Sequence, residues 1–319
     1  MAQNARARVS GEHPCGSRSA REPHPYDGPM RSHHAPPVQT RLRLAHGCLE
    51  HLARGAGVRL LHVKGEALDP QLGANRYISS DCDVLVHPRD VSRYTRILIE
   101  NGWERRTQFE HGSVFGHAAT YYSPVWGTVD LHRCFPGLDR DPAATFEALW
   151  SAHTERLMGG VRCPVPSLTK QRLLLLVHAA RDSSGRRHHD LQVSWNEVAD
   201  EEHRRLDALA DELGATVPLA IVTGRPERAT GLPGERTWRA VHADLNPTEV
   251  WKARLSDARR EPLRFARLLL SATRVNPDHL ALRLGHPPSA EEMRHEWWRR
   301  CGRGRRRLLA SLRRRSPRS

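Results

Sequence analysis

The sequence predicts an α+β protein, in which a small mixed β-sheet with packed helices is followed by an all-helical domain. Two observations support this. Up to about residue 160, short runs rich in β-branched and aromatic residues alternate with helical patterns. Beyond that point the strand-like runs give way to apolar residues at three- and four-residue spacing. The 319 residues are enough for two modest domains with a sizeable core.

The first half, residues 39–160, should contain the strands of the sheet and the helices that cover it. A helical pattern runs from Thr40 until Gly55 and Gly57 interrupt it. The expected order is then a strand over 58–63, a helical turn over 66–68, a strand over 81–86, a helix over 91–98, and strands over 103–107, 119–123 and 127–132. Pro88 suits the first turn of the helix over 91–98, and Gly102 ends it. Polar or Pro/Gly breaks between the last three runs indicate antiparallel strands.

The second half, residues 161–285, should be helical. Ser167 is placed to cap an apolar helix over 168–180. Helical patterns continue through 206–213 and 262–270. Asn246-Pro247-Thr248-Glu249 has an N-cap residue, a proline at the first helical position and an acidic residue two positions later, which predicts a helix start.

The two ends of the chain differ from the middle in composition. Residues 1–38 hold six prolines and few large apolar side chains, so they cannot bury enough surface to offset their ordering entropy, and we expect disorder. Residues 286–319 should form a helix starting near Ser289 and leading into an arginine-rich tail, with ten arginines and no acidic residue between positions 299 and 318. The tail thus accounts for ten of the fourteen net positive charges, and its expected role is nonspecific contact with anions or nucleic acid.

Composition also bears on the compartment. The six cysteines are scattered, without a C-x-x-C pair, which favours a reduced, cytoplasmic protein. The apolar runs are too short to span a bilayer, and the N-terminus lacks the apolar segment of a secretory signal. The histidines show no ligand spacing typical of zinc.

Three aspartates carry the chemistry that the sequence predicts. Side chains alternate along a strand, so Asp81 and Asp83 point to the same face, at the start of the apolar run 84–86. Two such carboxylates repel each other unless a cation lies between them. Asp130, in the strand-like run 127–132, is expected to close the cluster from another strand. Three carboxylates suit Mg²⁺, which keeps positions open for water and phosphate oxygens, so we expect a phosphoryl or nucleotidyl transfer site.

Other residues near this cluster have two open interpretations. Lys64 is one of only three lysines in an arginine-rich chain, which suggests a required ammonium group, although a surface lysine at a strand end is the alternative. His132 follows Asp130 by two positions and shares its face, where it is either a partner or base beside the carboxylates or a structural histidine.

The ordered combination of these segments resembles a known family. The segments are Val63-Lys64-Gly65-Glu66-Ala67, Asp81-Cys82-Asp83-Val84-Leu85-Val86, Asn101-Gly102-Trp103, Val129-Asp130-Leu131-His132, and, in the helical half, Leu176-Val177-His178-Ala179-Ala180-Arg181 with Asp190-Leu191. They are similar to the bacterial "uncharacterised nucleotidyltransferase" family of the DNA-polymerase-β-like nucleotidyltransferase superfamily. The resemblance spans about residues 40–230. Arg76 lies five residues before Asp81, where the family arginine usually lies four before, and Gly65-Glu66 replaces the superfamily's Gly-Ser.

The resemblance implies an enzyme that moves a nucleoside monophosphate from an NTP, with ATP expected, to a hydroxyl of a small molecule or peptide metabolite, releasing pyrophosphate. Asp81, Asp83 and Asp130 would be both catalytic residues and ligands of two Mg²⁺ ions, with Mn²⁺ as the alternative. Lys64 and Gly65 would contact the nucleotide, His132 and Arg76 would support the site, and the helical half would shape the acceptor pocket. Two alternatives stay open: nucleotidylation of a protein or tRNA, and a non-enzymatic nucleic-acid-binding protein that uses the arginine tail.

Overall fold

The computed structural model describes residues 36–76, 79–109, 116–182, 186–259 and 261–313. The expectation of disorder over residues 1–38 therefore falls almost wholly outside the described residues. The same holds for the side chains of residues 303–319, on which the expected anion contact of the arginine tail depends.

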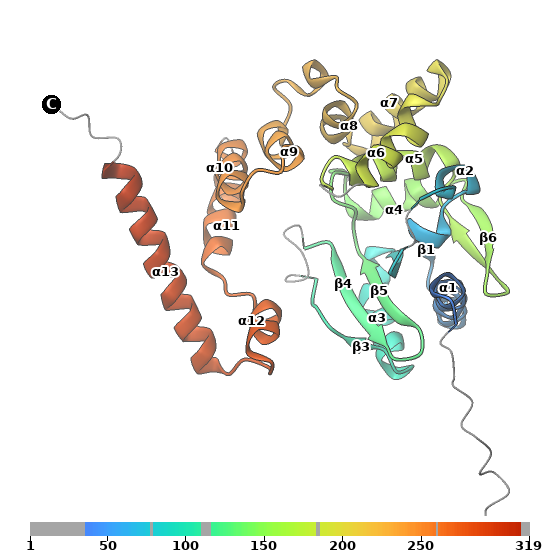
Figure 1. The fold of residues 1–319 in the computed structure, drawn as a ribbon, viewed down its shortest axis with the longest axis horizontal. Coiled ribbons are helices and arrows are strands. Elements are labelled where there is room, and N and C mark those ends of the chain that lie inside the picture. Colours follow the sequence, from blue (N-terminus) through green and yellow to red (C-terminus); the bar gives the residue numbers. More distant parts are fainter. Residues whose placement is uncertain (1–35, 77–78, 110–115, 183–185, 260, 314–319) are drawn as a thin grey trace, which may run out of the picture. The chain divides into compact units, whose positions relative to one another are not determined.

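Five strands form the central sheet, in the order β1-β2-β5-β4-β3 (Figure 1). Their bounds are Leu60–Val63 for β1, Asp81–Val86 for β2, Glu104–Arg105 for β3, Ala118–Ser123 for β4 and Gly127–His132 for β5. β2 and β5 run parallel, whereas the other neighbours are antiparallel. The mixed sheet predicted from the sequence is confirmed. β3 is shorter than the expected 103–107, because the amides of Arg106 and Thr107 both donate to the carbonyl of Thr120 and the regular ladder ends there.

One face of the sheet packs on α1 (Val38–Gly55) and α3 (Val91–Glu100). The strands contribute alternate side chains to this core, as a period of two requires. Its members from the sheet and the two helices include Cys82, Val84, Val86, Val129 and Leu131 together with Leu42, Leu49, Tyr94 and Leu98. The other side chains of β2 and β5 therefore point to the opposite face, which is the face that carries Asp81, Asp83 and Asp130.

The opposite face meets the helical half in a second core. Leu61, Val63 and Leu85 of the sheet share this core with buried residues of α4 (Pro142–Trp150), α5 (Leu168–Ala179), α7 (Asp200–Leu213) and α8 (Thr216–Val222). α5 has little amphipathic pattern because it is apolar on nearly all sides, with residues 173–177 all buried. The placement of α5 on the sheet is therefore set by a continuous apolar core.

A two-stranded hairpin was not anticipated by sequence reasoning. β6 (Thr154–Met158) pairs antiparallel with β7 (Val161–Val165), through a turn at Gly159 and Gly160, which both have positive φ. β6 is mostly exposed and polar, so the apolar periodicity that marks a buried strand is missing. The hairpin packs its Met158, Cys163 and Val165 against Ala67.

The predicted helix starts have different outcomes. The side chain of Asn246 accepts hydrogen bonds from the amides of Thr248 and Glu249, which confirms the start of α10 (Pro247–Ala258). Ser167 does lie at the N-cap of α5, but its hydroxyl makes no capping hydrogen bond with the described residues. There Gln171 is the residue that bonds locally, donating from its side-chain amide to the carbonyl of Pro166.

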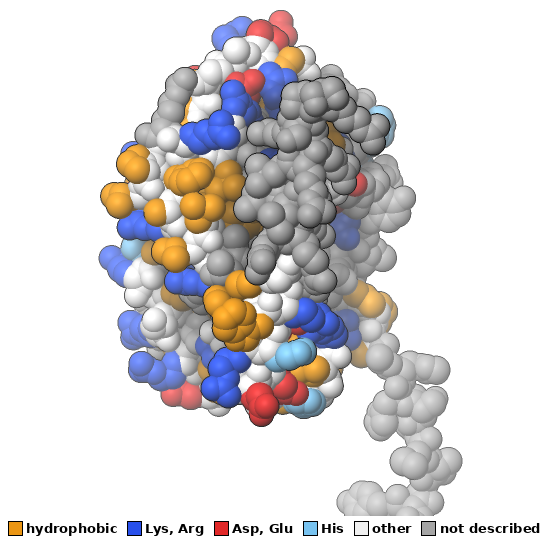
Figure 2. Space-filling view, turned by 90° about the vertical axis from the view of Figure 1, so that its left-hand side faces the viewer, with side chains coloured by type: hydrophobic (Ala, Val, Ile, Leu, Met, Phe, Trp, Pro, Cys, Tyr) orange, Lys and Arg blue, Asp and Glu red, His pale blue; other side chains and the backbone are white. Residues whose placement is uncertain are grey.

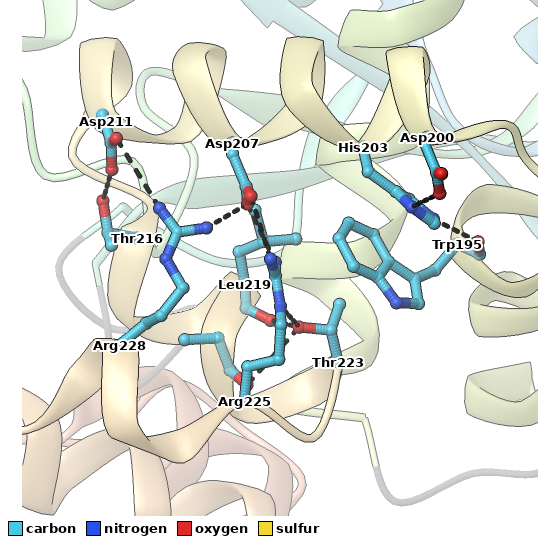
Figure 3. Close-up of polar contacts among 11 residues, drawn as sticks. Trp195, Asp200, His203, Asp207, Asp211, Thr216, Leu219, Thr223, Arg225 and Arg228 are labelled. Carbon is cyan, nitrogen blue, oxygen red and sulfur yellow. Dashed lines mark hydrogen bonds and ion pairs between the residues drawn. The ribbon is translucent and has the colours of Figure 1, made fainter.

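Ion pairs hold the helical half together on its outer side (Figure 3). Arg225 donates two hydrogen bonds to Asp207 of α7, at 2.9 and 2.8 Å, and its guanidinium lies 4.3 Å from the ring centre of Trp195. Arg228 binds the same carboxylate at 2.5 Å. Although burial alone would raise the pKa of Asp207, these hydrogen bonds hold it below its usual range. The network joins α7 to the segment that follows α8.

The remaining helices are α2 (Pro70–Gly73), α6 (Arg186–Leu191), α9 (Glu235–His242), α11 (Pro262–Thr273), α12 (Pro277–Leu284) and α13 (Ala290–Arg313). α13 begins with a reciprocal capping box between Ser289 and Glu292, as the sequence suggested. Glu296 binds Arg283, Arg299 and Arg300, so two arginines at the start of the basic segment are already paired within the chain.

Figure 2 shows apolar side chains exposed between Lys and Arg on one face of the molecule. Across the described ranges, the helices are too short or too polar to cross a membrane.

Candidate active site

Two carboxylates face each other where β2 and β5 run side by side. The parallel register pairs Asp83 with Asp130 and Asp81 with Thr128. Asp130 also accepts a hydrogen bond from the Thr120 hydroxyl of β4, at 2.8 Å. The structure thus brings Asp83 and Asp130 together, from strands 47 residues apart in the chain, as strand parity suggested. Asp81 points from the same edge, one pleat before Asp83.

A cation does lie against this cluster, and it is the Lys64 ammonium. β1 is antiparallel to β2 and pairs Val63 with Asp83, so its end delivers the next residue to the carboxylates. The Nζ atom of Lys64 lies 2.5 Å from Oδ1 of Asp83, and Nε2 of His132 lies 2.7 Å from the same oxygen. Burial alone would raise the pKa of Asp83, but Lys64 and the hydrogen bond from His132 hold it well below its usual range. Asp83 is therefore ionised in the folded protein.

The backbone at Lys64 is strained. Its φ of 57° and ψ of −173° lie in a region that is normally reserved for glycine. Gly65 follows with a φ of +48°, and a Cβ atom there would lie 3.0 Å from the Cβ of Ser79. The hydroxyl of Ser79 in turn lies 3.0 Å from Oδ1 of Asp81, to which it donates, and 3.0 Å from the backbone carbonyl oxygen of Asp81. The Lys64-Gly65 turn therefore packs directly on the residue that orients Asp81.

The other two carboxyl groups have the opposite electrostatic environment from Asp83. The pKa of Asp81 is raised, first by burial and then by the charges of Asp83 and Asp130. The pKa of Asp130 is raised as well, by burial and by the charge of Asp83. One cation thus neutralises one carboxylate and leaves the other two short of positive charge.

This donor set fits a divalent cation. One ligand atom from each of Asp83, Asp130 and His132 lies within 4.8 Å of the others. Because His132 already bonds to Asp83 through Nε2, carboxylate oxygens make up most of the free donors, and these suit Mg²⁺ or Mn²⁺ better than softer ions. The sequence had named Asp81 in place of His132 in this group.

Arg76 is bound to the helical half of the protein. It forms a bidentate ion pair with Asp190 of α6, at 2.8 and 3.1 Å, and both side chains are buried. It therefore links the loop before β2 to the helical half. Asp190 belongs to the segment that the sequence had matched to the family, but without a role.

Sequence reasoning assigned no role to several groups beside the carboxylates. Phe135 lies after β5, and its ring centre is 6.0 Å from Nζ of Lys64 and 5.8 Å from the guanidinium of Arg181. His117 lies 5.2 Å from His132, ring centre to ring centre, and burial followed by the charges of His132 and Arg181 lowers its pKa to about 2. A cavity of about 600 Å³ adjoins the group, with His117, Phe135 and Trp238 in its wall. Arg181 lay in the segment 176–181 that carries the family resemblance, but it was assigned no role from the sequence.

A mixed sheet with facing aspartates on adjacent strands, backed by helices, defines this protein as a nucleotidyltransferase. More particularly, the chain belongs to the family described as "Uncharacterised nucleotidyltransferase", whose sequence model matches residues 39–228, more than half of its length. The resemblance noted in the sequence is thereby confirmed. Curated proteins offer no match to the sequence.

Two solved structures are among the matches to this chain. A lincosamide antibiotic adenylyltransferase with lincomycin bound is 16% identical, with a TM-score of 0.34, and the match covers 48% of this chain and 94% of that one. The antibiotic-resistance factor ANT(2'')-Ia is 14% identical, with a TM-score of 0.39, and the match covers 56% of this chain and 95% of that one.

Proposed function

We propose that this nucleotidyltransferase moves a nucleoside monophosphate from an NTP, with ATP expected, to a hydroxyl group of a small molecule or peptide metabolite, releasing pyrophosphate. The observation that carries the proposal is the pairing of Asp83 with Asp130 on adjacent parallel strands, beside a lysine held in a strained backbone conformation. Strain of this kind persists at functional sites because the surrounding structure enforces it.

Asp83 and Asp130 would hold divalent metal, with Asp81 and His132 as further donors. When bound, such an ion neutralises phosphate charge and acidifies a coordinated hydroxyl. The chain's own residues prepare the site in specific ways. His132 fixes one oxygen of Asp83, and Thr120 fixes one oxygen of Asp130, so both carboxylates keep a defined orientation.

Asp130 is the group that we assign as proton acceptor for the attacking hydroxyl. In the metal-free chain its pKa is raised by burial and by the charge of Asp83, which distinguishes it from Asp83. Phosphoryl transfer asks little covalent chemistry of the protein, so positioning and charge neutralisation supply most of the acceleration. The cavity beside His117, Phe135 and Trp238 is the proposed binding place of the acceptor, and the helical half would shape this pocket.

The test is a screen of the four NTPs against a metabolite and peptide library, with pyrophosphate release as the readout. Turnover should require Mg²⁺ or Mn²⁺, and Asp130→Asn should abolish it without unfolding the protein. Thr248→Val, at an exposed position in the first turn of α10, serves as a control that should keep full turnover. Metal-independent turnover, or full turnover by Asp130→Asn, would remove the basis of the proposal.

A further inference from the structure

One buried arginine next to the carboxylate cluster has no acidic partner. Arg181 follows the C-terminal end of α5 and is largely buried, and its Nε atom finds no hydrogen-bond partner among the described residues. Among the described residues, two other buried guanidinium groups are paired with carboxylates, Arg76 with Asp190 and Arg172 with Glu202. In the described part of the chain, Arg181 forms no such ion pair. Burial lowers its pKa, although Asp83 and Asp182 act in the opposite direction.

The position of Arg181 is set by the rigid part of the molecule. Val177, one turn earlier in α5, lies in the same apolar core as Val63 and Leu85 of the sheet. The guanidinium of Arg181 is 5.8 Å from the ring centre of Phe135, which is the ring that Lys64 also approaches. A side chain held by a helix end and an aromatic ring keeps its place without a ligand, so it is preorganised for one.

His178 adds a second unpaired group at the end of α5. The backbone amide of Arg181 donates to the carbonyl of His178 at 3.0 Å, so the two residues belong to the same turn of chain. The Nδ1 atom of His178 is buried and has no hydrogen-bond partner among the described residues. Burial, followed by the charges of Lys64 and Arg181, lowers its pKa to about 3, so the ring is neutral at physiological pH. A neutral imidazole beside a guanidinium offers one more N–H donor without adding charge repulsion.

We propose that Arg181 and His178 form a phosphate-binding subsite for the β- and γ-phosphates of the nucleotide. The inference deepens the proposed function and rests on it. Lys64 is already bound to Asp83, so the cluster needs another cation to receive the phosphates. A guanidinium binds phosphate oxygens through parallel N–H donors, and an anion would supply the charge that the buried Arg181 lacks. The same contact would stabilise the charge that develops on the leaving pyrophosphate.

The experiment measures binding of inorganic tripolyphosphate to the full-length protein by calorimetry, with and without Mg²⁺. Arg181→Met should weaken binding roughly 10–100-fold, which is the loss expected for charge-assisted hydrogen bonds. Arg181→Lys should restore only part of it, because an ammonium group lacks the planar fork. Arg93→Met, which removes the same charge from the exposed side of α3, is the matched control and should bind as the wild type does.

Thermal unfolding separates this subsite from a structural role. Removing a buried charge without a partner should leave the Tm of Arg181→Met unchanged or raise it. A lowered Tm together with wild-type tripolyphosphate affinity would assign Arg181 to the fold and overturn the inference, as would a wild-type protein that fails to bind tripolyphosphate with or without Mg²⁺. Weaker binding by Arg181→Met in a protein that turns over no NTP would uphold the subsite and reject the proposed function.

Discussion

Replacing Asp83 by asparagine should destabilise the metal-free protein by about 3 kcal/mol, the low end of what removing one partner from a buried ion pair costs. The asparagine carbonyl can still accept from His132, but Lys64 loses its counter-charge at 2.5 Å, and only 12% of the Lys64 side chain is exposed. For a chain of 319 residues the loss corresponds to a fall in Tm of roughly 4–5 °C.

Calorimetric unfolding in EDTA at pH 7.5 measures the effect, and a double-mutant cycle assigns it to the pair. Adding Lys64→Met to Asp83→Asn should recover most of the stability, since neither variant side chain then carries a buried charge. Lys252→Met, at an exposed site on α10 outside the cluster, is the control for loss of an ammonium group. A double variant as unstable as the sum of the two single variants would refute the coupling between Lys64 and Asp83.

The pH dependence has a definite sign. The pKa of Asp83 is lower in the folded chain than in the unfolded chain, so its ionisation stabilises the fold above the unfolded carboxyl pKa of about 4. That contribution is lost as the pH falls below this value toward the folded pKa. The gap in Tm between the wild type and Asp83→Asn should therefore be constant from pH 6 to 8 and narrow below pH 4. A gap that widened in acid would contradict the assignment.

Three further substitutions test neighbouring parts of the structure by thermal unfolding in EDTA. Asp130→Asn should raise the Tm at pH 7.5, because its raised pKa means that the buried charge is unfavourable, and the gain should vanish as the pH falls toward 4. Gly65→Ala should cost more than Gly57→Ala, since both have positive φ but only the former brings a Cβ atom to 3.0 Å from Ser79; equal losses would exclude that contact. Asp207→Asn should cost about 1–3 kcal/mol by weakening the hydrogen bonds of two arginines, and an unchanged Tm would make this network dispensable.

Strand parity and the order of apolar runs were enough to predict the central part of the site. A period of two places Asp83 and Asp130 on the face of the sheet opposite to the core formed with α1 and α3. Each strand was recognisable by its valines and leucines. The mixed sheet followed from the same runs. These features depend on neighbours in sequence, which is why a single sequence shows them.

Contacts between distant segments were not predictable in this way. The ion pair of Arg76 with Asp190 joins residues 114 positions apart, and the sequence pattern contains nothing that links them. The β6–β7 hairpin is polar on its exposed strand, so it lacks the alternation that would mark it. The identity of the cation beside Asp83 also depended on β1 pairing antiparallel with β2, a choice that the sequence left open.

The three carboxyl groups of the site differ in the charge state that their surroundings favour, and this difference is informative about their work. Lys64 and His132 keep Asp83 ionised, so it is suited to hold a cation at every pH near neutrality. Within the described ranges, the hydrogen-bond donor to the Asp130 side chain is the neutral hydroxyl of Thr120, and burial and the charge of Asp83 raise the pKa of Asp130. Environments that push the pKa values of adjacent acids apart separate a permanent anion from a proton acceptor. The sheet produces this difference because β1 ends beside Asp83 and β4 presents Thr120 to Asp130, and the proposed function would use it to separate the two roles.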